Sequence, residues 1–245
     1  MRPIEELLKA IHDFKNSPNP EPLRITAEED ALLEAYKDRQ LEEKIDAALN
    51  KGDLQGAAYH IGTARNWGNF QQRLLLQYAD RFTDPQALFD LIIEVYTSNG
   101  YDFPKKLILK AKQLSRQIPQ EHRLNELPEG DPVTIYRGCN VANPESGNFV
   151  RTAISWTTSK TQAIWFANRI SNPNTENGKG VVWEGTIDRD KIIAFTQARH
   201  ESEVIQHMNV KGQHIIDIPP DEWEAALQYQ VALSQAAWEQ MQKGD

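Results

Sequence analysis

The chain has 245 residues, of which 40% are hydrophobic and 25% are charged, as is typical of a globular protein with one large domain or two small ones. Its formal net charge of −8 is shared by both halves: residues 1–130 hold 17 basic and 21 acidic residues, and residues 131–245 hold 10 and 14. Because a uniformly acidic chain repels phosphates at long range, the composition disfavours an extensive nucleic-acid surface.

Membrane insertion and disulfide bonding are also disfavoured. The sequence has no apolar run approaching the roughly 18 residues that read as a membrane span, and its N-terminus lacks the basic and then apolar segments of a secretory signal. The single cysteine, Cys139, excludes an internal disulfide framework and fits a reducing compartment. We therefore expect a cytoplasmic location, in the producing cell or in a target cell, with no membrane partner.

Apolar residues recur at helical spacing in the first half of the chain. Thr26, followed by Glu28 and Glu29, predicts the start of a long helix, because a hydroxyl caps the first turn and acidic residues favour its positive end. Pro104 is well placed in the first turn of another helix. We expect residues 1–125 to form an all-helical domain that binds a partner or a substrate, with helical segments around 7–14, 26–52, 54–78, 85–96 and 104–118.

From Pro132 the pattern changes to short β-rich runs bounded by Gly, Asn and Pro. A helix at 160–170 interrupts these runs, and the last 25 residues, from Asp221, return to helical spacing. Proline, glycine and acidic residues cluster at 126–131, which predicts the linker. The chain is therefore expected to be α+β, with residues 131–245 as the second domain and strands at 133–136, 152–157, 180–187, 192–196, 203–210 and 214–218.

Arg137 and Gly138 close the first of these strands. A guanidinium stays charged at any working pH and grips phosphates with several donors at once. A glycine beside it lets a ligand approach the bare backbone closely. Taken alone, the pair is more often a surface arginine before a turn.

The next strand carries Ser155, Trp156 and Thr157. Alternate residues of a strand share a face, so the two hydroxyls are expected to point together while Trp156 packs on the other side. Two hydroxyls suit a ribose diol. A second register, with Thr157 and Ser159 as the pair, stays open, and Ser159 also suits the cap of the helix that follows.

A Glu-Ser-Glu, Glu201-Ser202-Glu203, opens a later strand. On an extended segment its two carboxylates would lie on one face, about 6–7 Å apart. One carboxylate can stabilise an oxocarbenium-like sugar cation, and the other can take a proton from a nucleophile. By itself a Glu-x-Glu is more often a solvated strand edge.

The three pieces, in this order, resemble the arginine–serine–glutamate class of mono-ADP-ribosyltransferases over residues 131–219. The family pattern at the second piece is usually Ser-Thr-Ser, so Trp156 is a departure. The resemblance implies an ADP-ribosyltransferase-like split β-sandwich core with flanking helices. In relatives a helix follows the strand that carries the second piece. The resemblance implies that the helix after Ser159 is the counterpart of that helix.

Residue roles follow from this resemblance. Arg137 would hold NAD and Gly138 would contact the nicotinamide amide through its backbone. Glu203 would be the catalytic residue at the nicotinamide ribose, and Glu201 would engage the acceptor. Ser155 and Thr157 would order the ribose face. Trp165 and Phe166, on the helix at 160–170, are candidate cofactor contacts, although core packing is the ordinary role for at least one of them.

The expected activity is therefore transfer of ADP-ribose from NAD, as co-substrate, to a macromolecular acceptor, with a protein arginine favoured. RNA or DNA acceptors stay open, because residues 104–118 carry five bases and no acid. An NAD glycohydrolase and an inactive binding adaptor stay open as well. The absence of a secretory signal suggests a bacterial or phage toxin or host-modifying effector with a neutralising partner or chaperone. No residue spacing predicts a metal site.

Overall fold

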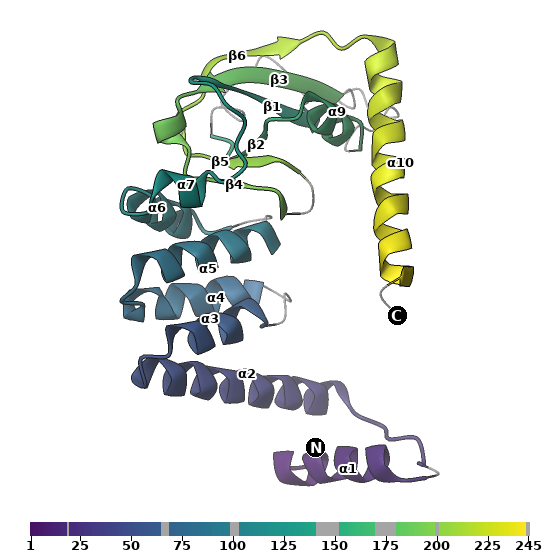
Figure 1. Cartoon of the computed structure of the whole chain (residues 1–245). Coiled ribbons are helices and arrows are strands. Elements are labelled where there is room, and N and C mark those ends of the chain that lie inside the picture. Colours follow the sequence, from purple (N-terminus) through teal and green to yellow (C-terminus); the bar gives the residue numbers. More distant parts are fainter. Residues whose placement is uncertain are drawn as a thin grey trace. The chain divides into compact units, whose positions relative to one another are not determined.

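The chain forms two compact units, Met1–Phe103 and Pro104–Asp245 (Figure 1). Unit 1 is helical and unit 2 combines an antiparallel sheet with helices, so the predicted α+β class is confirmed. No helix in the described part of the chain is both long and apolar enough to cross a membrane. The computed structural model describes residues 1–18, 20–64, 69–98, 103–140, 152–169, 180–198 and 201–243.

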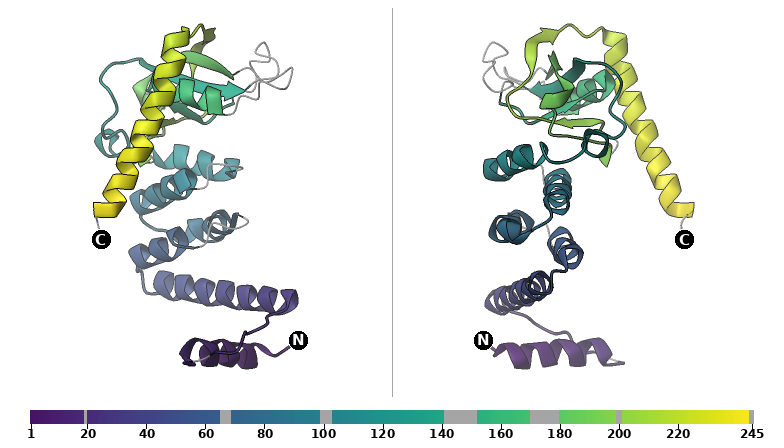
Figure 2. Two further views of the ribbon diagram at one scale, coloured as in Figure 1. Left: turned by 90° about the vertical axis from the view of Figure 1, so that its right-hand side faces the viewer. Right: turned by 60° about the vertical axis from the view of Figure 1, so that its left-hand side comes forward.

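Helices that lie side by side build unit 1 (Figures 1 and 2). Their buried side chains include Ile45, Ile61, Leu74 and Ile92, which are fully buried, so the predicted apolar faces meet in a common interior. The helices are α1 (Ile4–Asn16), α2 (Ala27–Asn50), α3 (Leu54–Gly62), α4 (Phe70–Tyr78), the short 3₁₀ helix η2 (Ala79–Arg81) and α5 (Pro85–Ser98).

Thr26 caps α2, as predicted. Its hydroxyl accepts from the Glu29 amide at 3.2 Å, and the Glu29 carboxylate accepts from the Thr26 amide at 3.1 Å, which completes a capping box. Arg2 donates to the same carboxylate from Nε and Nη2, both at 2.9 Å. These bonds from Arg2, and then that from Thr26, hold the pKa of Glu29 well below its usual range.

One antiparallel sheet organises unit 2, in the order β4-β5-β2-β1-β3-β6 (Figure 1). The strands are β1 (Val133–Asn140), β2 (Ser155–Thr157), β3 (Gly180–Ile187), β4 (Ala194–Thr196), β5 (Glu203–Ile205) and β6 (Lys211–Ile216). The helices are α6 (Lys105–Leu114), α7 (Gln120–Arg123), α9 (Lys160–Arg169), η3 (Arg189–Lys191) and α10 (Pro220–Lys243). The strand predicted at 180–187 and the helix predicted from 160 are confirmed.

The sheet has two differently covered faces. On one face α9 packs on β1 and β3, and a cluster joins Ala163, Ala167 and Val182 with Tyr136 and Trp223. The other face holds the main core, in which side chains from strands, loops and the segment after α7 pack together. Members of that core are Leu124, Leu127, Val133, Ile135, Cys139, Trp156, Trp183, Ile192, Phe195 and Val204.

The boundary between the units differs from the predicted linker at 126–131. Leu124 and Leu127 are buried in the core of unit 2, and the Arg123 guanidinium donates through Nη1 to the Ile192 carbonyl. The proline, glycine and acidic residues near this segment therefore mark a turn-rich connection inside unit 2. Both α6 and α7 belong to the same unit as the sheet.

Gly138 is required by close packing rather than by ligand approach. A Cβ at this position would stand 1.8 Å from the Ala163 carbonyl oxygen and 2.5 Å from the Ala167 nitrogen, both backbone atoms of α9. Gly180 on β3 meets the same helix, where a Cβ would lie 2.2 Å from the Ala167 oxygen. The expectation that the missing side chain leaves room for a ligand is corrected, because α9 fills that space.

We expect Gly138→Ala to lower the free energy of unfolding of the full chain by at least about 2 kcal/mol, because strand and helix backbones must separate. Urea unfolding followed by tryptophan fluorescence measures this change. Thr134→Ala, at an exposed position of the same strand, is the control and should shift the free energy by less than about 0.5 kcal/mol. Equal stability of the two variants would contradict the packing argument.

Candidate functional site

The register of the sheet aligns a row of polar side chains across four neighbouring strands. Tyr136 on β1 pairs with Glu184 on β3 and with Thr157 on β2, and Thr157 pairs in turn with Glu203 on β5. Directly paired residues of antiparallel strands point to the same face, with Cβ atoms about 5 Å apart. The row therefore brings Thr157 and Glu203, two residues singled out from the sequence, next to each other.

Glu203 is the first residue of β5 and is only 4% exposed. The buried Val204 and Ile205 follow it into the core. A carboxylate at the start of a buried strand is fixed in position and shielded from water, which strengthens its interaction with any charge that develops beside it.

The Thr157 hydroxyl is hydrogen-bonded to two neighbouring backbone groups. Its Oγ1 donates to the Glu201 carbonyl at 2.8 Å and accepts from the Ser159 amide at 3.0 Å. A neighbouring bond, from the Thr158 amide to the Ser202 carbonyl at 3.1 Å, supports the same turn. The hydroxyl predicted to order the ribose face is therefore engaged in joining β2 to the Glu-Ser-Glu segment.

The Glu-Ser-Glu segment is a turn rather than an extended strand. Ser202 has φ +46°, in the left-handed region that non-glycine residues rarely adopt. Its hydroxyl donates to Gln197 Oε1 at 3.0 Å, and β5 begins only at Glu203. The extended geometry expected for Glu201 and Glu203, with alternate residues on one face, is thus wrong, and their relative orientation is set by this turn.

The hydroxyls of Ser155 and Ser159 lie in different surroundings. Ser159 caps α9, because its Oγ accepts from the Gln162 amide at 3.2 Å. Ser155 lies on the same face as Thr157, is half-buried, and its hydroxyl makes no hydrogen bond to any residue within the described ranges. Ser155 is therefore the hydroxyl best able to bind a ligand, and Thr157 and Ser159 serve the local backbone.

Trp156 points away from these hydroxyls, as predicted. It is 2% exposed, belongs to the main core, and donates from Nε1 to the Ala153 carbonyl at 3.3 Å. The departure from the family pattern at this position therefore does not alter the face of the strand that carries Ser155 and Thr157.

Arg137 lies on the other face of the sheet from Glu203. It pairs with Trp183 across β3 and follows the alternation of Ile135 and Cys139, which belong to the main core. Its guanidinium nevertheless reaches the edge of β2, where Nη1 donates to the Ser155 carbonyl. The sequence predicted that arginine and glutamate would surround one ligand. In the structure their strands, β1 and β5, lie on either side of β2, and the side chains of Arg137 and Glu203 lie on opposite faces of the sheet.

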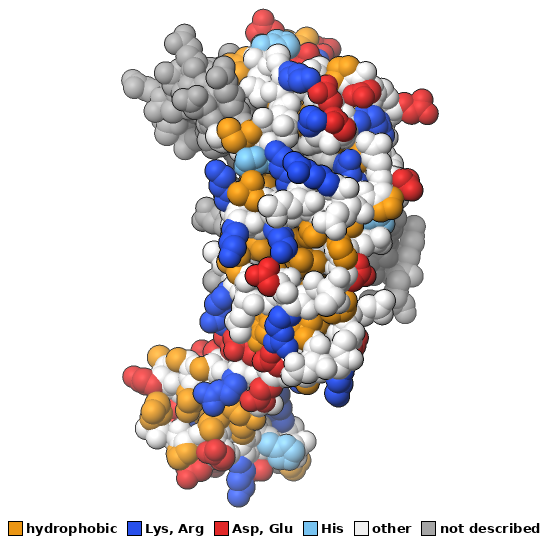
Figure 3. All heavy atoms as spheres, turned by 90° about the vertical axis from the view of Figure 1, so that its left-hand side faces the viewer, with side chains coloured by type: hydrophobic (Ala, Val, Ile, Leu, Met, Phe, Trp, Pro, Cys, Tyr) orange, Lys and Arg blue, Asp and Glu red, His pale blue; other side chains and the backbone are white. Residues whose placement is uncertain are grey.

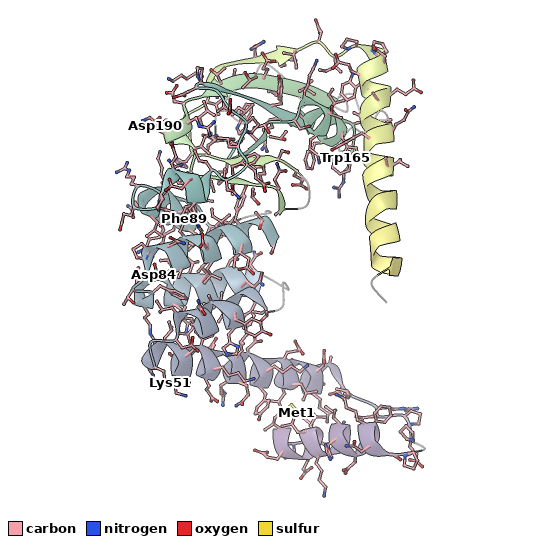
Figure 4. All side chains as sticks on the ribbon, viewed as in Figure 1. Met1, Lys51, Asp84, Phe89, Trp165 and Asp190 are labelled. Carbon is pink, nitrogen blue, oxygen red and sulfur yellow. The ribbon has the colours of Figure 1, made fainter. Side chains whose placement is uncertain are left out.

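Trp165 and Phe166 are half-buried neighbours on α9 (Trp165 is labelled in Figure 4). Their ring centroids lie 4.9 Å apart in an edge-to-face arrangement, and the Arg169 guanidinium lies 5.2 Å from the centroid of Trp165. Neither ring belongs to the two core clusters of the sheet. They remain able to take part in stacking.

Tyr136 and Glu184 were not singled out as site residues, yet they continue the polar row beyond Thr157. Burial and the neighbouring Glu184 carboxylate raise the pKa of the Tyr136 hydroxyl. On the next strand His214 Nε2 lies 3.7 Å from Glu184 Oε1. Only the pairing register aligns these residues, and no motif in the sequence marks them.

Among the described residues, no three His, Cys, Asp or Glu side chains come together to hold a metal ion. Comparisons with protein-family models, with curated proteins and with solved structures find no match to this chain.

Proposed function

We propose that this chain is an NAD-dependent mono-ADP-ribosyltransferase, with an ADP-ribosyltransferase-like split β-sandwich as the core of unit 2. The observation that supports it best is the order of the strands. The three segments that carry the family resemblance are far apart in the sequence, yet they occupy the neighbouring strands β1, β2 and β5.

The reaction breaks the bond between ribose C1′ and the ring nitrogen of nicotinamide. Nicotinamide leaves as a neutral molecule with the bonding electrons, and the ribose becomes an oxocarbenium-like cation. The buried Glu203 carboxylate stabilises that cation more strongly than it stabilises the ground state. Ser155, on the same face, is placed to bind the ribose hydroxyls.

The acceptor then forms a new bond to C1′ and loses a proton. Glu201, in the turn before β5, is the residue proposed to receive that proton or to orient the acceptor. Its main chain is tied to β2 by Thr157, so the turn holds Glu201 close to the reacting strand. By family resemblance an arginine side chain of a protein is the favoured acceptor.

Arg137 is proposed to bind the NAD phosphates from the β1 side of β2. We expect Arg137→Ala to weaken NAD binding at least about tenfold, the scale of losing a charge-assisted hydrogen bond. Isothermal titration calorimetry with NAD measures the change. Arg39→Ala, which removes an exposed arginine of α2 in unit 1, should bind within about twofold of the unchanged protein. Unchanged NAD affinity in Arg137→Ala would remove this residue from the site.

The proposed function is tested with NAD labelled in the adenylate part. The full chain is incubated with the label and with separated protein, RNA and DNA from a cell lysate. We expect label in the protein fraction, sensitive to chemistry that releases arginine-linked ADP-ribose. Label only in nucleic acid would change the acceptor, and free ADP-ribose as the main product would identify a glycohydrolase. No consumption of NAD under any condition would reject the proposal and favour a binding adaptor.

A further inference from the structure

Helix α6 carries charges of one sign. From Pro104 to Gln120 the chain has five basic residues and no acidic one. Lys105, Lys106 and Arg116 are exposed, and Lys112 is half-buried. The apolar side of the helix is buried through Leu107, Ile108, Ala111 and Leu114. The charged side chains on the solvent side of α6 are therefore all positive.

Ion pairs elsewhere in unit 2 involve other basic residues. Lysine ammonium groups of α9, η3 and β6 contact carboxylates: Lys160 with Glu222 at 2.7 Å, Lys191 with Asp190 at 2.5 Å and Lys211 with Asp188 at 2.5 Å. Lys105, Lys106, Lys112 and Arg116 take part in none of the ion pairs found among the described residues. Their positive potential therefore extends into solvent.

The turn between β5 and β6 lies beside this helix. Lys112 Nζ donates to the His207 carbonyl at 3.4 Å, and Asn209 Nδ2 donates to the same oxygen at 2.8 Å. The buried Gln206 side chain fixes the turn by accepting from the Asn209 amide at 2.9 Å. Met208, held at φ +58°, is 58% exposed.

His207 contributes a ring rather than another charge. Burial, and then the charges of Lys112 and Lys105, lower the pKa of its imidazole, so the ring is neutral near pH 7. Lys105 and Lys112 are seven residues apart, so they lie on one side of α6 and about 10 Å apart along its axis. The surface therefore places a row of cations beside the half-buried neutral ring of His207 and the exposed thioether of Met208.

We propose that Lys105, Lys106, Lys112 and Arg116, with His207 and Met208, form a binding surface for single-stranded nucleic acid, here named the α6 basic surface. Phosphates contact the cations, and a base packs against the ring and the thioether. Apolar groups beside the cations favour this ligand over an acidic peptide, which has no bases to pack. Figure 3 shows Lys and Arg side chains gathered on the side of the molecule where Figure 1 draws α6.

This inference does not rest on the proposed NAD chemistry, because binding is measured without NAD. The overall charge of −8 repels a polyanion at long range, so binding is expected only where cations gather locally, as they do on α6. Such binding weakens steeply with salt, by about 0.7 in log affinity per unit of log salt for each contacted phosphate.

The test is fluorescence anisotropy of the full chain with a labelled oligouridylate of about 12 nucleotides, at several salt concentrations. We expect Lys105→Glu/Lys106→Glu to weaken binding at least about tenfold and to reduce the salt slope by about 1.4, the value for two lost contacts. Met208→Ala is expected to weaken binding about threefold with the slope unchanged, because it removes packing and no charge.

The matched control is Lys9→Glu/Lys15→Glu, which makes the same change of charge at two exposed positions of α1 in unit 1. It is expected to bind within about twofold of the unchanged chain. Equal weakening by both pairs would show that only net charge matters and would overturn the proposal, as would the absence of binding by the unchanged chain. A polyglutamate peptide of the same length that competes equally well would also overturn it.

Discussion

Glu203→Gln is expected to lower the rate of ADP-ribose transfer at least about a hundredfold, the scale for losing one preorganised electrostatic group. The change keeps the size of a side chain that is 4% exposed at the start of β5, so the fold should be retained. It removes the negative charge that is proposed to stabilise the developing ribose cation. Initial rates with saturating NAD and acceptor measure the effect.

A carboxylate of the same polar row provides the control. Glu184→Gln makes the same chemical change two strands away from β2, at the residue that pairs with Tyr136 across β1 and β3. Its transfer rate should stay within about threefold of the unchanged protein. Activity of Glu203→Gln near that of the unchanged protein would end the assignment of a transferase site at β5. Equal losses in both variants would point to a general effect of charge on this face.

Glu201→Gln distinguishes the two carboxylates. If Glu201 serves the acceptor, this variant should lose transfer while retaining slow hydrolysis of NAD, because water still reaches the ribose cation. The ratio of free ADP-ribose to transferred ADP-ribose is the informative measurement. Equal loss of hydrolysis and transfer would place Glu201 at the ribose with Glu203.

Local patterns predicted the regular elements well where one physical signal dominates. The helix α9 was found from its cap and its apolar spacing, and β3 from a β-rich run between polar loops. The Thr26 capping box is another such signal, because its two hydrogen bonds lie within one turn. Each of these features depends only on residues a few positions apart.

The features that define the site depend on distant residues, which is why the sequence did not predict them. Glu201 and Glu203 were expected on an extended strand, but the left-handed Ser202 and the bond from Thr157 turn the chain there. The partner of Thr157 lies 44 positions away. The facing of Arg137 depends on the register between β1, β2 and β3, which no local pattern encodes.

The sequence marks Gly138 for one reason, and the structure gives another reason for a glycine at this position. The sequence marked this glycine because the family resemblance gives it a backbone contact with nicotinamide. In the structure its missing Cβ admits the backbone of α9, which packs on β1 across Ala163 and Ala167. A helix that lies this close to β1 also fixes the strand that carries Arg137. The glycine therefore contributes to the proposed site by positioning the strand.

Thr157→Val is expected to lower kcat for transfer about thirtyfold while leaving the KM for NAD within about twofold. Valine keeps the shape of threonine but removes the hydroxyl that links the Glu201 carbonyl to the Ser159 amide. Each of these partly buried backbone groups then lacks that bond, at a cost of up to about 1–3 kcal/mol, and the turn that holds Glu201 loosens. Steady-state kinetics over a range of NAD concentrations separate the two constants.

Thr157→Ser keeps the hydroxyl and should restore kcat to within about threefold of the unchanged protein, because serine can make the same two bonds. Ser155→Ala is the companion variant, since its hydroxyl is the one proposed to bind ribose, and it should raise the KM for NAD more than it lowers kcat. The opposite pattern, with KM raised by Thr157→Val and kcat lowered by Ser155→Ala, would exchange the two roles. It would return Thr157 to the ribose contact that the sequence alone suggests.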